Sequence, residues 1–197
     1  MSLPRADAAA VPAPRAPFAG SAALGMALFV FTEAMLFAGF ISAFAITRDS
    51  TPAGLWPPPD QPRLPFERTA ANTVALLLSG VALYVAGRTF RSGRAKAAGR
   101  WMGAALGLGS LFVLAQGMEW AGLLRQGLTL TSSQLGSFFY LIVGAHAAHA
   151  VAALVSMGYA WAWHRSGRLT AARLGAVQMF WYFVVLVWPL IYWQVYR

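Results

Sequence analysis

Long apolar runs alternate with short polar segments along almost the whole chain. Each run approaches or exceeds the about 20 residues that a helix needs to cross a bilayer. In lipid, an α-helix satisfies its own backbone hydrogen bonds, so each run predicts a transmembrane helix. We therefore predict an all-α membrane protein, a bundle of five transmembrane helices within residues 18–197. The helices are expected at about residues 18–47, 69–91, 100–125, 135–164 and 172–196.

Residues 1–17 differ from the rest of the chain. They are rich in Ala and Pro and lack apolar periodicity, which is typical of a flexible tail. The apolar run that follows is longer than the about 7–15 residues of a signal-peptide core. We therefore predict an N-terminal tail that leads into the membrane domain.

Composition supports the membrane prediction. Hydrophobic residues make up 58% of the 197 residues and charged residues only 11%, whereas a typical soluble domain has about 25% charged residues. The absence of Cys excludes a disulfide framework and a thiolate metal site within the chain. A net charge of +9 would indicate nucleic acid in a soluble protein. Here the basic residues cluster between apolar runs, which indicates membrane topology and anionic lipid headgroups instead.

The basic residues fall unevenly on the two sides of the predicted bundle. The more basic side is cytoplasmic by the positive-inside rule. We therefore expect a cytoplasmic N terminus and a C terminus on the outer, periplasmic side. The basic side would carry Arg5, Arg15, Arg88, Arg91, Arg94, Lys96, Arg100, Arg165, Arg168 and Arg173, against Arg48, Arg63, Arg68, Arg125 and Arg197 opposite.

Ionisable side chains inside the apolar runs are the candidates for chemistry. They are Glu33, Glu119, His146 and His149. A charge at bilayer depth costs about 2.5–3.5 kcal/mol, so each should have a partner or a function. At about 1.5 Å per residue, Glu33 and both histidines fall near mid-membrane. We therefore expect a direct or water-bridged hydrogen bond from Glu33 to the fourth helix, and two roles stay open for its carboxyl: proton exchange, or a protonated structural contact.

The histidine pair also has two interpretations. His146 and His149 lie three residues apart on one helix and could hold a metal or haem. Apart from them the chain has only His164, at a membrane boundary, and no Cys. We therefore favour hydrogen-bonded structural histidines. No phosphate loop, Ser–His–Asp spacing or metalloprotease motif is present, which indicates a subunit rather than an independent enzyme.

Several strings in fixed order carry a family resemblance. The first helix reads LGMALFVFTEAMLFAGFISAFA, the third ends AQGMEW, and the fourth reads GSFFYLIVGAHAAHAVAAL. Together they resemble subunit III of haem-copper terminal oxidases of the cytochrome c oxidase type, in a short five-helix bacterial form. The matching positions are Glu33, the loop residues Trp56, Pro57 and Pro58 with Asn72 downstream, the Gln116–Glu119 pair, and His146 with His149.

The resemblance implies a non-catalytic role in a proton-pumping oxidase that reduces oxygen to water in aerobic respiration. Such a subunit is part of an enzyme, but it has no catalytic, cofactor-binding or metal-binding residue of its own. Haem and copper are expected in partner subunits, and phospholipid is a further expected ligand. The implied partners are subunit I in direct contact, subunit II and other respiratory subunits. The implied location is the bacterial inner membrane, and the implied role is support of stability and proton uptake.

The last helix departs from the family pattern and leaves alternatives open. It reads FWYFVVLVWPLIYW, with Tyr182 and Val185 where many members have a histidine and an aspartate. A related branch serves nitric oxide reductase as an accessory protein, and another belongs to quinol oxidases. A small proton-coupled transporter that uses Glu33 is the alternative from a different class. Transporters commonly show internal repeats, and none is evident among the five runs.

Overall fold

The computed structural model describes residues 21–52, 55, 56, 58, 62, 64 and 66–196. These residues form helices and no strand. All five helices are long and apolar enough to cross a membrane, which confirms the predicted fold class. The helices are α1 Ser21–Ser50, α2 Phe66–Arg91, α3 Ala95–Arg125, α4 Gln134–Arg165 and α5 Ala171–Tyr196.

Two helices begin three or more residues earlier than the apolar runs predict. Helix α2 begins at Phe66 instead of residue 69, and α3 begins at Ala95 instead of residue 100. The added turns carry Glu67, Arg68 and Lys96. Charged side chains at helix ends reach the headgroup region while their backbone stays helical. Apolarity therefore marks the membrane core, and the helices extend past it.

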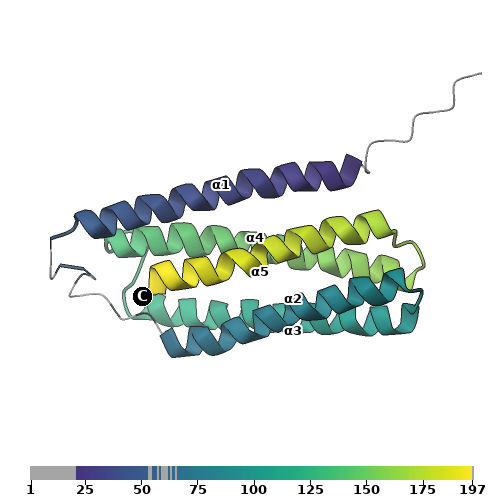
Figure 1. Ribbon diagram of the computed structural model, residues 1–197. Helices are drawn as coiled ribbons and strands as arrows, with labels where there is room; N and C mark the ends of the chain where they lie inside the picture. The colour runs from purple at the N-terminus through teal and green to yellow at the C-terminus, as the bar shows by residue number, and fades with distance from the viewer. Residues whose placement is uncertain are drawn as a thin grey trace, which may run out of the picture.

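Helix α5 lies at the centre of the bundle. It packs against α1, α4 and α2, whereas α3 packs against α2 and α4. Figure 1 shows α1 as the outermost helix, on the far side of α4 and α5 from the α2–α3 pair. Helix α1 is accordingly the least buried of the five and α5 the most buried.

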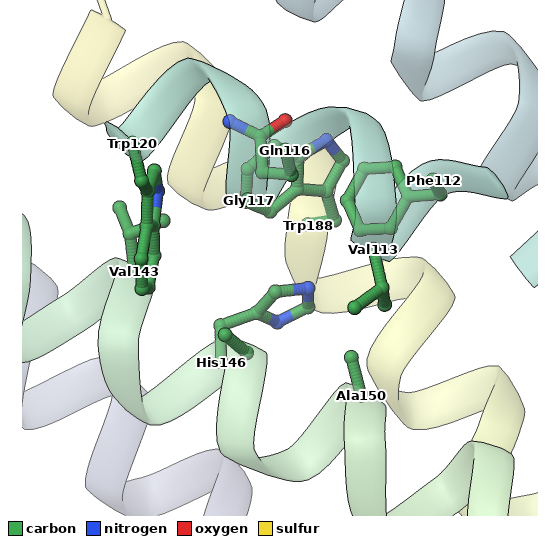
Figure 2. A pocket seen from close by; sticks show the side chains of 10 residues that line it. Phe112, Val113, Gln116, Gly117, Trp120, Val143, His146, Ala150 and Trp188 are labelled. Carbon is green, nitrogen blue, oxygen red and sulfur yellow. The ribbon is translucent and has the colours of Figure 1, made fainter. Parts of the chain in front are cut away.

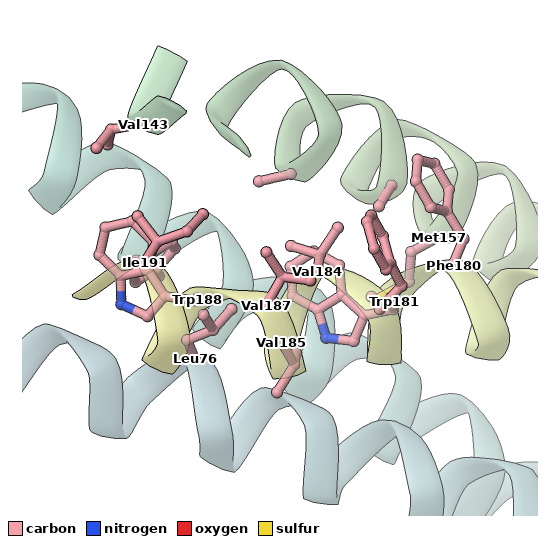
Figure 3. Packing of buried hydrophobic residues seen from close by; sticks show 14 of the residues in the cluster. Leu76, Val143, Met157, Phe180, Trp181, Val184, Val185, Val187, Trp188 and Ile191 are labelled. Atoms are coloured by element: carbon pink, nitrogen blue, oxygen red, sulfur yellow. The ribbon is translucent and has the colours of Figure 1, made fainter. Parts of the chain in front are cut away.

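Large aromatic side chains on α5 fill the core. Trp181 and Trp188 are fully buried, and Figure 3 shows them along α5 with Val184 and Ile191. Both indoles donate hydrogen bonds to hydroxyl groups of α2, so their polar edges are satisfied inside an apolar core. The helix runs continuously through Pro189.

Glycines bring the helices together at two kinds of position. Gly93 and Gly167 have φ of 71°, a left-handed conformation that glycine adopts without steric cost. They make tight turns at one end of the bundle, which place α2 beside α3 and α4 beside α5. Within α3, a Cβ on Gly109 would lie 2.7 Å from the Trp181 ring and 2.8 Å from Leu154. This glycine therefore makes room for the central tryptophan.

Candidate functional site

A carboxyl–imidazole pair joins the outermost helix to the bundle. The Glu33 Oε2 atom of α1 lies 3.0 Å from the Nε2 atom of His149 on α4. The two side chains are 19% and 17% exposed, respectively. The predicted hydrogen bond between Glu33 and the fourth helix is therefore confirmed, and it is direct.

The second nitrogen of His149 fixes how protons are arranged in the pair. Nδ1 lies 2.7 Å from the Ala145 carbonyl oxygen. A carbonyl can only accept, so Nδ1 carries a hydrogen and donates it. A neutral His149 therefore accepts at Nε2 from a protonated Glu33. A charged His149 donates at Nε2 to a Glu33 carboxylate. In both states one proton lies between the two side chains and the pair has no net charge.

Aromatic rings surround the pair. The ring of Phe37 lies 5.5 Å from the His149 ring, and those of Phe180 and Phe183 lie 6.3 and 6.2 Å away. Phe37 of α1 and Phe180 and Phe183 of α5 therefore form an apolar wall around the imidazole.

His146 has a different environment from His149. It is 2% exposed, and both ring nitrogens are buried without a hydrogen-bond partner among the described residues. Figure 2 shows its ring pointing into a cavity near Trp188, Phe112 and Gln116. The cavity has a volume of about 190 Å³. Among the described residues, His149 thus has hydrogen-bond partners and His146 has none.

A hydrogen-bond network crosses α2, α3 and α5 near the C-terminal end of α3. Gln116 is its centre: Nε2 donates to Glu119 Oε2 at 3.1 Å and to the Tyr196 hydroxyl at 2.9 Å. Asn72 donates to Gln116 Oε1 at 3.1 Å, and Thr69 donates to Glu119 Oε2 at 2.8 Å. The network therefore unites Asn72 and Glu119, which the sequence predicts as separate candidates.

The polar contacts of the central tryptophans are not among the contacts predicted from the sequence. Trp181 Nε1 donates to Ser79 Oγ at 3.1 Å, and Trp188 Nε1 donates to Thr73 Oγ1 at 2.9 Å. A signal was present, because a tryptophan deep in lipid needs an acceptor for its N–H group. Hydroxyl residues on α2 supply that acceptor.

The loop residues of the family resemblance, and the two α5 positions that depart from the family pattern, make packing contacts or hydrogen bonds within the bundle. Trp56 packs edge-on against Phe44 of α1, with ring centroids 5.6 Å apart. Pro58 is partly buried, and Pro57 lies outside the described residues. The Tyr182 hydroxyl accepts a hydrogen bond from Gln178 at 3.0 Å. Val185 faces Gly80, where a Cβ would lie 3.3 Å from its side chain. Where many family members have a histidine and an aspartate, Tyr182 thus makes a hydrogen bond to Gln178 and Val185 packs closely against Gly80.

The polar groups are distributed through the bundle. In the part of the chain that the structure describes, no three His, Cys, Asp or Glu side chains are grouped as a metal site requires. Glu33 with His149 can hold or exchange a proton. The Gln116 network and the tryptophan contacts bind neighbouring helices to one another.

Comparison with known proteins gives a consistent result. The family model described as cytochrome c oxidase subunit III matches residues 17–197. The chain is 29% identical over 176 residues to the probable cytochrome c oxidase subunit 3 of Mycobacterium leprae (strain TN), covering 88% of this chain and 86% of the relative. It is 27% identical over 176 residues to cytochrome c oxidase subunit 3 of Synechocystis sp., covering 87% and 73%.

A relative from a further organism has the same name. The chain is 28% identical over 184 residues to cytochrome c oxidase subunit 3 of Pelomedusa subrufa, covering 87% of this chain and 67% of that protein. These names favour neither a nitric oxide reductase accessory protein nor a transporter. The match of the family model over nearly the whole chain shows that this protein belongs to the cytochrome c oxidase subunit III family.

Proposed function

We propose that this chain is the non-catalytic subunit III of a proton-pumping haem-copper terminal oxidase. Membership of the family makes it a subunit of an oxidase complex and a multi-pass membrane protein. The finer role proposed here is to support the stability and proton uptake of subunit I, in direct contact with it. Haem and copper belong to the partner subunits in this proposal, and subunit II is a further partner.

The pairing of Glu33 with His149 is the observation that supports this role best. Their one shared proton makes the pair neutral as a whole, which lowers the cost of placing it in lipid. The pair also links α1 to α4, two helices that otherwise make few contacts. A neutral pair of this kind suits a subunit that stabilises a larger membrane complex, and its proton can move between the two side chains without creating a net charge.

The location and orientation are also part of the proposal. The end of the bundle where α2 and α4 finish and α3 and α5 begin is called here the basic end. In the bacterial inner membrane, the positive-inside rule would place it on the cytoplasmic side. The described cations at this end are Arg88, Arg91, Arg94, Lys96, Arg100, Arg165, Arg168 and Arg173.

Deletion of this chain tests the proposed role. The oxidase purified without it should keep its haem spectrum and initial oxygen consumption, because the redox centres lie elsewhere. It should lose activity sooner during continuous turnover, and its proton uptake should slow. The measurement is oxygen consumption over time, with the complete complex as control. Loss of the haem signal, or an unchanged active lifetime, would contradict the proposal.

A further inference from the structure

A cavity lies between α3 and α4, beside the central helix α5. It has a volume of about 190 Å³ and is lined by residues of all three helices. Figure 2 shows the His146 ring pointing into it from α4, with Trp120 of α3 and Trp188 of α5 around it. Neither Glu33 nor His149 lines it, so the cavity is separate from the carboxyl–imidazole pair.

Nitrogen atoms without partners lie in the residues that line the cavity. Both ring nitrogens of His146 and the indole nitrogen of Trp120 are buried and have no hydrogen-bond partner among the described residues. The Gln116 amide also lines the cavity, but it is engaged with Asn72 and Glu119. Burying a polar group without a partner is unfavourable. A ligand that forms hydrogen bonds with these nitrogens would therefore be held at this position.

The rest of the lining is mainly apolar. Phe112 and Val113 of α3, Val143 and Ala150 of α4 and Trp188 of α5 contribute hydrocarbon surface. An apolar cavity of about 150 Å³ can bind benzene. The space here therefore accommodates one aromatic ring with a small substituent.

The cavity opens sideways, within the membrane-spanning part of the bundle. Gly117 lines it and is exposed, and a Cβ at this position would meet no atom within 4 Å. This glycine lies about two turns before Arg125, the last residue of α3. A ligand would therefore enter from the apolar surroundings of the helices, which favours an uncharged molecule.

We infer that this cavity binds a small uncharged phenol, whose ring packs against the apolar walls and whose hydroxyl bonds to His146 and Trp120. A neutral imidazole has one acceptor nitrogen and one N–H group, and an indole has an N–H donor only. A phenol hydroxyl both donates and accepts, so it suits the imidazole acceptor and the indole donor. Benzene would leave the nitrogens without partners, and water would leave the apolar walls without contacts, whereas a phenol uses both features.

Two fluorinated probes that differ in one hydroxyl test this assignment. Binding of 4-fluorophenol and of fluorobenzene to the purified oxidase complex is measured by fluorine NMR titration, for the wild type and for His146→Leu. The wild type should bind 4-fluorophenol more tightly than fluorobenzene. His146→Leu should weaken 4-fluorophenol binding by about fivefold, the typical contribution of one hydrogen bond, and leave fluorobenzene binding near wild type. An equal effect on the two probes, or no saturable binding of 4-fluorophenol, would overturn the proposal.

Substitutions at two exposed glycines of α3 show where the probe binds. Gly117→Leu fills the mouth and keeps every polar group of the cavity, so it should abolish saturable 4-fluorophenol binding. The matched control is Gly107→Leu, which adds the same side chain to the same helix outside the cavity, where a Cβ would likewise meet no atom within 4 Å. The control should bind like the wild type, and both variants should keep the subunit content of the complex. Equal binding by the two variants would place the probe elsewhere and contradict the site.

Discussion

At the residue scale, two histidines that lie three residues apart on α4 differ in their hydrogen bonds. His149 uses both ring nitrogens, on Glu33 and on the Ala145 carbonyl oxygen, whereas neither nitrogen of His146 has a partner among the described residues. The sequence predicts both residues at the same depth. It does not predict their partners, because positions three apart on a helix differ by about 60° in direction. That angle is enough to turn one ring toward α1 and the other toward α3 and α5.

Substitution of Glu33 separates a structural contact from an obligatory proton relay. Glu33→Gln keeps a donor for His149 Nε2, so the complex should stay assembled and oxygen consumption should change less than about twofold. Glu33→Ala leaves a buried nitrogen unpaired, at a cost of about 1–3 kcal/mol, and should lower the unfolding temperature and loosen α1. If Glu33→Gln abolishes turnover in an intact complex, the carboxyl is an obligatory relay.

Leucine substitutions at the two histidines should have unequal effects. His146→Leu replaces an unpartnered polar ring with an apolar side chain, so thermal stability should be unchanged or higher. His149→Leu leaves the Glu33 carboxyl without its partner and should lower stability by about 1–3 kcal/mol. Thermal unfolding of the purified protein measures both. Equal destabilisation would indicate that His146 has a partner of its own, such as a bound water.

At the element scale, hydropathy predicts the helices but not their neighbours. Apolar length suffices to predict spanning helices, since lipid leaves the backbone no other hydrogen-bond partners. The central place of α5 and the outer place of α1 depend on side-chain fit. Trp181 packs where α3 has Gly109, and its N–H group reaches Ser79 of α2. The hydropathy of a segment does not show which residue of one helix packs against which residue of another.

Alanine substitutions at two glycines of α3 test this packing. A Cβ on Gly109 would lie 2.7 Å from Trp181, whereas one on Gly107 would meet nothing within 4 Å. Gly109→Ala should therefore destabilise the bundle by about 1–3 kcal/mol through overpacking. Gly107→Ala should be neutral or stabilising by up to about 1 kcal/mol, because alanine favours helix. Thermal unfolding in one detergent compares them, and equal effects would contradict the α3–α5 fit.

At the scale of the whole molecule, charge predicts orientation. The described carboxylates outside mid-membrane lie at the opposite end from the basic end. A reporter fused after Arg197 should therefore report the outer side of the membrane, and one inserted within residues 92–99 should report the cytoplasm. Alkaline phosphatase and green fluorescent protein activities measure the two positions. Helices α3, α4 and α5 lie between the two reporters, so three crossings should put the reporters on opposite sides. Both reporters on the same side would contradict this topology.

Association of this chain with a haem-copper oxidase is tested by affinity purification of the tagged chain from native membranes in mild detergent, followed by an absorption spectrum and subunit quantification. We expect a haem-containing oxidase to co-purify with the chain in a one-to-one ratio and to consume oxygen. A chain that purifies free of haem protein, or together with a nitric oxide reductase, would contradict it.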